Sequence, residues 1–158
     1  MAFPWMISAN TRGITALRLG KQGSPASPGL HGNLTARRRR AEAEKELRAY
    51  FAGRLKTFAA RYDISELPRF TQAVLELTAQ VPYGEVRSYA WVARALGKPN
   101  AARAVGNALA RNPVPVIIPC HRIVRTDGTI GGFALGSGWK KRLLDLEKQG
   151  VQSIHRRK

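Results

Sequence analysis

The chain has 158 residues, of which 27 are basic and 10 are acidic, so its formal net charge is +17. This length suits one compact domain or two small ones, and a hydrophobic content of 44% is enough for a true core. The charge excess favours a polyanionic partner, most simply nucleic acid, with an anionic membrane surface as the alternative.

The cysteine and histidine content narrows the class of protein further. A single cysteine excludes an internal disulfide. The three histidines, His31, His121 and His155, show no metal-ligand spacing, so we expect no metal site. The chain shows no signal-peptide pattern and no run as long as a transmembrane helix. We therefore expect a soluble protein without a membrane partner, cytoplasmic and nucleoid-associated in a prokaryote and nuclear otherwise.

The N-terminal segment predicts a β-hairpin followed by a helix. Residues 5–9 and 14–19 flank a short turn that contains asparagine and glycine. Residues 20–32 are rich in Gly, Ser and Pro and indicate a loop. A helix follows, with the basic run Arg37–Arg40 near its start and Gly53 at its end. The run is either a solvated helix start, offset by nearby glutamates, or a nucleic-acid contact.

The middle of the chain predicts three helices. The first begins after Pro68, ends before the Pro-Tyr-Gly sequence at 82–84, and carries an apolar face at helical spacing. That face consists of Phe70, Val74, Leu77 and Val81. The other two helices span residues 89–96, capped by Ser88, and residues 101–110. A short link containing glycine joins them, which is typical of a helix-turn-helix.

The second helix of this pair consists largely of Ala and Gly, with Arg103 among them. Small side chains let a helix backbone approach another surface closely. Two surfaces fit: the protein's own core, or a DNA groove, which the net charge favours.

The only cysteine, Cys120, follows the apolar run 115–118, which predicts a buried strand or extended segment. His121 and Arg122 stand beside it and can supply the base and the positive field that a thiol needs to become a nucleophilic thiolate. Burial opposes ionisation, but we expect the pKa of this thiol to fall below the free-thiol value of about 8.5. The alternative is an inert buried cysteine.

Beyond the cysteine, residues 126–128 indicate a turn and residues 131–138 form a glycine-rich segment. This segment lacks the Lys-Ser/Thr ending of a P-loop, which argues against nucleotide hydrolysis. It suits either the wall of a pocket for a flat ring or a flexible connection. A helix over 140–148 follows, and Glu147 beside its apolar residues is expected to point inward. A buried carboxylate needs a partner, for which His121 is a candidate.

Together these segments resemble the O6-alkylguanine-DNA alkyltransferases, also called methylated-DNA–protein-cysteine methyltransferases. The match covers residues 70–150, more than half of the chain. Its motifs are Val81-Pro82-Tyr83-Gly84, Ser88-Tyr89, Arg103-Ala104-Val105-Gly106, Asn112-Pro113, Pro119-Cys120-His121-Arg122, Gly131-Gly132-Phe133, and Leu143-Leu144 with Glu147. The resemblance implies an α+β fold. A shortened, variable N-terminal domain (1–67) precedes a mainly helical DNA-binding and alkyl-acceptor domain with a helix-turn-helix (68–153) and a basic tail (154–158).

The resemblance also implies an activity. A damaged nucleotide is flipped out of double-stranded DNA, and the alkyl group of O6-alkylguanine moves irreversibly to Cys120, once per molecule and without a cofactor. His121 is implied as a base acting through a water, and Glu147 as the group that orients it. Tyr89 is implied in nucleotide rotation and in protonation of the leaving guanine, and Asn112 as the brace between the recognition helix and the active site. We expect a monomer that can assemble cooperatively on DNA.

Further positions follow from the same resemblance. Arg103 is implied as the finger that fills the space left by the flipped base. Close DNA contacts are expected at Ala102, Ala104 and Gly106. The substrate pocket is expected to be lined by Pro115, Phe133, Ala134 and Lys140. Phe133 stands where many members have tyrosine, and Ala134 lacks a hydroxyl found in some relatives. Polar recognition of the lesion must then depend on the loop backbone and on Tyr89.

Three rival interpretations remain open. A non-catalytic lesion binder of the alkyltransferase-like group would lack the acceptor cysteine, which this chain has. A helix-turn-helix regulator with a structural cysteine leaves the Cys-His-Glu set unexplained. A cysteine hydrolase usually takes its base from a distant part of the sequence rather than from the adjacent residue.

Overall fold

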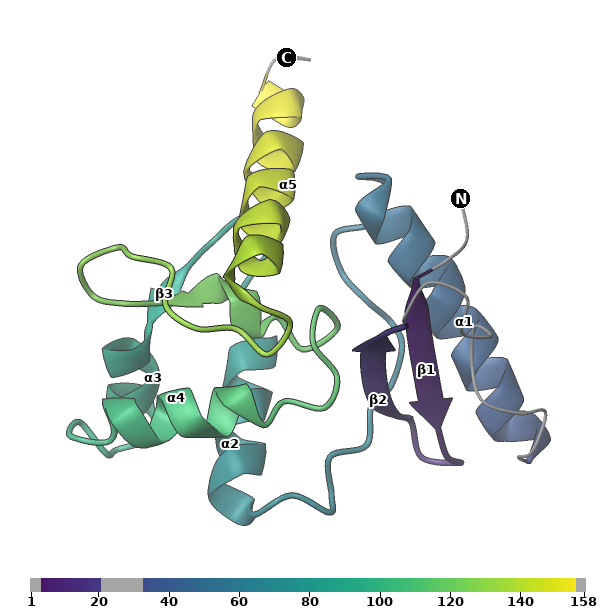
Figure 1. Cartoon of the computed structure of the whole chain (residues 1–158), viewed down its shortest axis with the longest axis horizontal. Helices are drawn as coiled ribbons and strands as arrows, with labels where there is room; N and C mark the ends of the chain where they lie inside the picture. Colours follow the sequence, from purple (N-terminus) through teal and green to yellow (C-terminus); the bar gives the residue numbers. More distant parts are fainter. Residues whose placement is uncertain (1–3, 21–32, 156–158) are drawn as a thin grey trace. The chain divides into compact units, whose positions relative to one another are not determined.

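The computed structural model describes residues 4–20 and 33–155 (Figure 1). The chain divides into two compact units, Met1–Glu66 and Leu67–Lys158. A two-stranded antiparallel sheet, a short parallel strand pair and five α-helices make up the described parts, which confirms the predicted α+β class. None of the helices in these parts is long and apolar enough to cross a membrane.

The N-terminal unit contains the predicted hairpin. Strand β1 (Trp5–Ala9) pairs with β2 (Ile14–Leu19), and Trp5 lies opposite Leu19. The Asn10 side chain closes the turn, because its Oδ1 accepts the backbone N–H of Gly13 at 2.9 Å. Most of the predicted loop, residues 21–32, lies outside the described residues.

Helix α1 (Leu34–Phe51) packs against β1 and β2. It buries one face, which consists of Ala36, Ala43, Leu47 and Tyr50. Gly53 follows at a φ of 71°, a left-handed conformation that ends the helix as predicted. Within the basic run, Arg38 pairs with Glu42 one turn later at 2.8 Å, on the exposed surface. This ion pair agrees with a solvated helix start, and a nucleic-acid contact of the run stays a prediction.

The second unit begins with α2 (Arg69–Ala79), whose buried face differs from the prediction. Its buried residues are Thr71, Val74, Leu75 and Thr78, whereas Phe70 and Leu77 are only half-buried. The stripe includes threonine because the Thr78 hydroxyl donates to the Val74 carbonyl at 2.7 Å, which satisfies this group inside the core. An apolar pattern alone therefore placed the face partly on the wrong residues.

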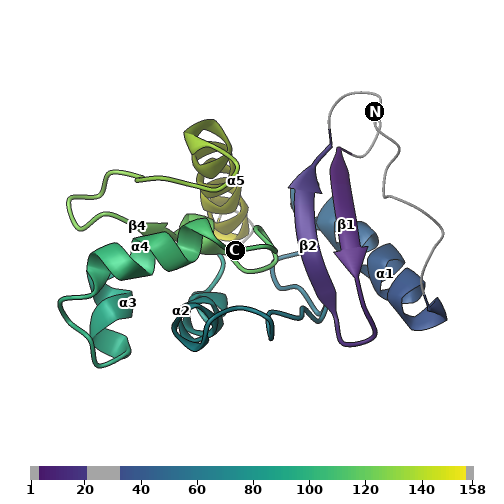
Figure 2. The same cartoon turned by 60° about the horizontal axis from the view of Figure 1, so that its bottom comes forward.

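The helix-turn-helix is present as predicted. Helix α3 (Tyr89–Ala95) lies beside α4 (Ala102–Ala110) in both views (Figures 1 and 2). The Ser88 side chain caps α3 by accepting the Trp91 N–H at 3.0 Å. In α4 the core-facing residues are Val105, Ala108 and Leu109, and Arg103 is exposed on the outer side. The small-residue helix thus has one face in the core and one face open to a partner.

Residues 115–118 do not form the predicted extended segment. They make a buried turn, in which the Ile118 N–H donates to the Val114 carbonyl at 3.0 Å. Val116 adopts a φ of 76°, which is rare for a β-branched residue. The apolar run predicted burial correctly. It predicted the wrong backbone because Asn112, described below, bonds this segment from within and folds it back on itself.

The segment that carries the predicted alkyl acceptor, here called the acceptor segment, follows this turn as a single turn of 3-10 helix, η1 (Cys120–Arg122). It leads into β4 (Ile123–Val124), which pairs in parallel with β3 (Arg87–Ser88), the segment immediately before α3. The sequence did not predict this short pairing. It ties the acceptor segment to the start of the helix-turn-helix.

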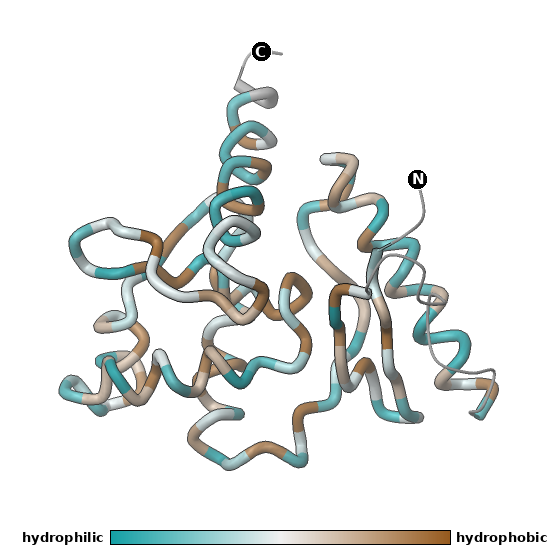
Figure 3. Tube along the Cα trace, in the orientation of Figure 1, coloured by the Kyte–Doolittle hydropathy of each residue, from teal (hydrophilic) through white to brown (hydrophobic). Residues whose placement is uncertain are grey.

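Helix α5 (Ser137–His155) is longer than the predicted 140–148. Hydrophobic and hydrophilic bands alternate along it (Figure 3). Its inward face carries Leu143 together with two charged residues, Lys140 and Glu147, each with 1% or less of its surface exposed. The helix extends two residues into the predicted basic tail, and residues 156–158 lie outside the described part of the chain.

Gly84 has a structural requirement that can be tested. Its φ is 79°, and a Cβ at this position would overlap the Val151 Cγ2 atom. We expect Gly84→Ala to lower the free energy of unfolding by more than the roughly 1–2 kcal/mol that a left-handed alanine costs.

The matched control is Gly97→Ala, since Gly97 has a φ of 69° and no atom within 4 Å of its ideal Cβ. This control should lose only about 1–2 kcal/mol. Urea denaturation of both variants provides the measurement. Equal losses would show that the contact with Val151 is relieved at no cost.

Candidate active site

Asn112 positions the cysteine. It stands just after α4, and its Nδ2 donates to both the Ile118 carbonyl and the Cys120 Sγ, each at 3.1 Å. Its Oδ1 accepts the Val114 N–H at 2.9 Å. One buried amide thus satisfies the backbone of the turn and holds the sulfur, which fits the predicted role as a brace.

The predicted pKa of Cys120 is wrong for this structure. Burial raises the pKa of its thiol to about 11, although the hydrogen bond from Asn112 and the charge of Lys140 both act in the opposite direction. The residue is 4% exposed, so a thiolate there would lose nearly all contact with water. The sequence-based prediction gave the neighbouring cations too much weight against desolvation. The thiol is therefore neutral at pH 7 in this conformation.

The predicted contact between His121 and Glu147 is present. His121 Nε2 and Glu147 Oε1 are 2.8 Å apart, and both side chains are buried. The same carboxylate accepts two hydrogen bonds from the Arg122 Nε and one from its Nη2, at 2.8–3.2 Å. It also accepts the Gly84 N–H at 2.9 Å. Each of these partners is a donor, as a buried carboxylate requires.

Arg122 has a different role from the one the sequence suggested. It was expected to act on the cysteine, but its guanidinium binds Glu147 and donates through Nη1 to the Val81 carbonyl at 2.6 Å. The sequence contained a signal for this pairing between Arg122 and Glu147. A single inward carboxylate in a basic chain needs a cation, and Arg122 is the one adjacent to the histidine.

The charges of this network decide which nitrogen of His121 carries the proton. Burial opposes the charge on Glu147, but the bonds from His121 and Arg122 outweigh it and bring its pKa down to about 2. Burial lowers the pKa of His121, so its imidazole is neutral at pH 7. An ionised carboxylate only accepts hydrogen bonds, so Nε2 of His121 must be the protonated nitrogen. Nδ1 then holds the lone pair and is the basic atom of the pair.

Lys140 and Tyr89 form a second polar group in the site. The Lys140 amine donates to the Ile123 carbonyl at 2.5 Å, to the Gly132 carbonyl at 3.2 Å and to the Tyr89 hydroxyl at 3.4 Å. Burial lowers the pKa of Lys140 to about 8. Burial, and the charge that Cys120 can carry, raise the pKa of Tyr89. Lys140 thus holds the glycine-rich loop and β4 together and places a donor beside the tyrosine.

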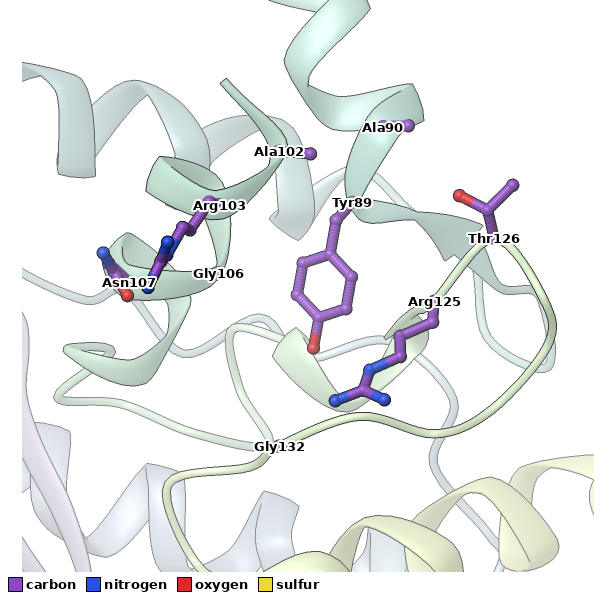
Figure 4. A pocket seen from close by; sticks show the side chains of 9 residues that line it. All are labelled: Tyr89, Ala90, Ala102, Arg103, Gly106, Asn107, Arg125, Thr126 and Gly132. Carbon is purple, nitrogen blue, oxygen red and sulfur yellow. The ribbon is translucent and has the colours of Figure 1, made fainter. Parts of the chain in front are cut away.

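An open pocket of about 450 Å³ lies next to this group (Figure 4). Its volume is within the range of small-molecule sites, roughly 300–1,000 Å³. It is lined by Tyr89, Ala90, Ala102, Arg103, Gly106, Asn107, Arg125, Thr126 and Gly132. Four of the predicted DNA-contact positions therefore meet here: Tyr89, Ala102, Arg103 and Gly106. Ala104, the remaining one, is exposed on α4.

None of the four residues predicted to line the substrate pocket lines this one. Pro115 is buried in the turn after α4, and Ala134 is exposed on the loop. Phe133 places its ring against His121, with centroids 6.3 Å apart and planes at 83°. Lys140 lies beneath the loop and contacts two residues of the pocket lining, Tyr89 and Gly132, without lining the pocket itself. The loop contributes Gly132 instead, because glycine leaves its backbone open to the pocket.

The sequence also missed Arg125 and Thr126, which form one wall of the pocket. They directly follow β4. Their position immediately after the acceptor segment was the signal that could have identified them from the sequence. In Figure 4 the side chains of Arg103 and Arg125 lie on opposite sides of the Tyr89 ring. This arrangement makes the pocket electropositive with an aromatic group at its centre.

The raised pKa of the thiol predicts a particular reactivity in the absence of DNA. Modification of Cys120 by iodoacetamide should stay slow up to about pH 9 and accelerate only toward a pH of about 11. The unfolded chain should show an inflection near about 8.5. Intact mass reports the reaction directly, because the chain has one cysteine. Asn112→Ala should raise the inflection further by removing a donor to sulfur. An inflection below about 8.5 in the folded protein would contradict this prediction.

Comparison with known proteins agrees with this geometry. Residues 69–149 match the family model described as "6-O-methylguanine DNA methyltransferase, DNA binding domain". A Mycobacterium leprae protein named methylated-DNA–protein-cysteine methyltransferase is 46% identical over 111 residues, which cover 70% of this chain and 67% of the relative. A protein of the same name from Methanosarcina barkeri is 42% identical over 114 residues, 70% of each chain.

Solved structures show the same likeness over more of the chain. The crystal structure of Mycobacterium tuberculosis OGT in complex with DNA has a TM-score of 0.80 and 34% identity, and the match covers 95% of this chain and 91% of that one. The O6-methylguanine-DNA methyltransferase of Pyrococcus kodakaraensis has a TM-score of 0.65 and 28% identity, with 89% of each chain covered. With the cysteine, its buried His-Glu pair and the pocket beside the helix-turn-helix, these matches establish that the chain belongs to the 6-O-methylguanine DNA methyltransferase family.

Proposed function

We propose that this protein is a direct-reversal DNA repair enzyme in which Cys120 accepts the alkyl group of O6-alkylguanine in double-stranded DNA, once and irreversibly. The observation that carries the proposal is the position of the only cysteine. It is bonded to Asn112 and stands next to the His121–Glu147 pair. It also lies close enough to Tyr89, which lines an electropositive pocket, for a thiolate charge to raise the pKa of that tyrosine.

Helix α4 supports DNA as the partner. Its outer face carries Arg103 and small residues, so its backbone can approach a groove closely. Gly106 already lies against the Tyr89 ring, since a Cβ on it would be 3.8 Å from that ring. The net charge of +17 supplies attraction to phosphates that does not depend on base sequence. A protein that must find a lesion anywhere in a genome needs this kind of binding.

The lesion must leave the base stack to reach a buried thiol. Extrusion costs a few kcal/mol of lost stacking and pairing. An inserted side chain offsets part of this cost. Arg103 is the proposed insert, because it is exposed on α4 and lines the pocket. Tyr89 is the proposed guide, because it lies at the centre of the pocket and its hydroxyl is 3.4 Å from the buried Lys140 amine.

The transfer itself is a substitution at the alkyl carbon. The Cys120 sulfur forms a bond to that carbon while the bond from carbon to guanine O6 breaks. The thiol proton passes, through a water, to Nδ1 of His121, and Glu147 stabilises the imidazolium that forms. The departing guanine takes a proton, for which the Tyr89 hydroxyl is the proposed donor. The product is a thioether that none of these groups can cleave, so one molecule acts once and no cofactor is required.

Substrate range follows from the loop. Phe133 offers a ring without a hydroxyl, and Ala134 offers no polar group. Recognition of guanine therefore depends on loop backbone groups and on Tyr89. We further propose that the protein is a monomer in solution that can assemble cooperatively on DNA. It would work where the genome is: in the nucleoid-containing cytoplasm of a prokaryote or in a nucleus.

One mass measurement tests the proposal against its rivals. After incubation with a duplex carrying O6-methylguanine, the intact protein should gain one methyl group, and Cys120→Ser should gain none. The variant should keep DNA affinity within about threefold, because affinity comes from phosphate contacts rather than from the thiol. A lesion binder or a regulator would gain no methyl group, and a hydrolase would turn over without a lasting mass change. Methyl transfer by the serine variant would contradict the assignment.

The buried pair predicts a change in pH dependence. Glu147→Gln should slow single-turnover transfer and shift the inflection of its pH–rate profile to higher pH. The reason is that an amide stabilises the imidazolium of His121 less well than a carboxylate does. The substitution should also reduce stability by about 3–5 kcal/mol, because the buried Arg122 loses its counter-charge.

Two variants complete this experiment. Glu147→Asp keeps the charge and should recover part of the wild-type profile. Glu44→Gln removes an exposed carboxylate that pairs with Arg48 and should change neither rate nor profile. If the pH profiles of wild type and Glu147→Gln coincide, Glu147 has a structural role only.

A further inference from the structure

Two arginines flank the pocket, and the proposed mechanism uses only one of them. Arg103 belongs to α4, whereas Arg125 comes from the segment directly after β4. The pocket lining includes no acidic residue. Within the described parts of the chain, no carboxylate lies within 4 Å of either guanidinium in an ion pair. The second guanidinium is thus an exposed positive charge that lies at a concave site and forms no ion pair with the described residues.

The backbone of Arg125 is fixed. Its N–H donates to the Thr129 carbonyl at 2.9 Å, and its own carbonyl accepts the Gly128 N–H at 3.0 Å. The nearest acidic residue along the chain, Asp127, is engaged by the Thr129 hydroxyl at 2.7 Å and the Thr129 N–H at 2.9 Å. Arg125 therefore starts from a hydrogen-bonded turn that continues the acceptor segment. Its charge helps to lower the pKa of Asp127, but the hydrogen bonds of that carboxylate go to Thr129.

The charge of Arg125 affects two other groups of the site, Tyr89 and Lys140. It acts to lower the pKa of Tyr89 and that of Lys140, both of which are mainly set by burial. Its side chain points toward the end of the ring that carries the Tyr89 hydroxyl (Figure 4). A group that enters the pocket past Tyr89 thus passes within reach of this guanidinium.

We propose that Arg125 binds a backbone phosphate next to the extruded nucleotide and so holds that nucleotide in the pocket while Cys120 reacts. Arg125 is a positioning residue in this assignment, which rests on the function proposed above. A guanidinium can bind a phosphate through two parallel N–H donors, a geometry that fixes orientation as well as charge.

The place of Arg125 favours a phosphate over the base. The residue is exposed at the rim, while Tyr89 and the loop extend toward the buried thiol. When a base enters a pocket, its sugar and phosphates stay at the rim. Arg103 on the opposite side fills the gap in the duplex, so the two arginines have different tasks: one replaces the base, and the other secures the strand that carries it.

The test has the form of a double-mutant cycle, in which removal of the Arg125 side chain is combined with neutralisation of one DNA phosphate. Single-turnover methyl transfer is measured for wild type, Arg125→Ala and Arg94→Ala on a duplex with one O6-methylguanine. The same duplex is then used with an uncharged methylphosphonate at the phosphate 5′ or 3′ to the lesion. Arg94 is the matched control, because it is exposed on α3, lies outside the pocket lining and removes the same charge.

We expect Arg125→Ala to slow transfer from the normal duplex at least about tenfold, as for a lost charge-assisted hydrogen bond, and Arg94→Ala to have a much smaller effect. One of the two methylphosphonates should slow wild type by a similar factor and slow Arg125→Ala little further. The variant should lose less activity with free O6-benzylguanine, which carries no phosphate.

Three results would overturn the inference. The first is an equal loss of transfer rate for Arg125→Ala and Arg94→Ala. The second is that each methylphosphonate slows Arg125→Ala by the same factor as wild type, and the third is that Arg125→Ala loses as much rate on free O6-benzylguanine as on the duplex. The last would assign Arg125 to the pocket chemistry instead. Failure of wild type to take a methyl group from the normal duplex would refute the proposed function itself, which separates the two.

Discussion

The active-site half of this protein depends on one buried carboxylate. Glu147 on α5 holds the imidazole of His121, the guanidinium of Arg122 and the backbone of Gly84. Through Arg122 the same network reaches the Val81 carbonyl, just beyond the end of α2. Helix α5, the acceptor segment and the turn before the helix-turn-helix are thus joined by one carboxylate, that of Glu147. Such a buried charge is stable only with all its partners, so the network specifies how these segments meet.

Burial raises the pKa of both Glu147 and Cys120, but the two groups end in opposite states. Glu147 is ionised and Cys120 is neutral. Glu147 stays ionised because its donors outweigh the loss of water, whereas Cys120 has one amide donor and a lysine at longer range and stays neutral. The resting protein therefore carries a basic Nδ1 on His121 beside a protonated thiol. The electrostatic cost of the thiolate has to be met while the substrate is in place, when its developing charge can pass directly into a new bond to carbon.

Small residues and basic residues have different roles on the surface around the site, because they differ in size and charge. Small residues on α4 bring backbone close to a partner, and long basic residues rise on both sides of Tyr89. The parallel pairing of β3 with β4 places the start of α3, and hence Tyr89, beside the segment that carries the cysteine. Two strands of two residues each therefore link the DNA-binding element to the chemical one.

Local sequence patterns predicted the N-terminal hairpin, the five helices and the family. Turn residues and caps such as Asn10 and Ser88 act within a few positions along the chain, so the hairpin and the helix-turn-helix could be predicted. The motifs around Cys120 likewise identified the family. Four features became visible only in the folded chain: the turn at 115–118, the partner of Arg122, the pocket wall at Arg125 and the neutral thiol. Each of these depends on which distant groups surround a residue and on how much water they exclude, and neither quantity is encoded in local spacing.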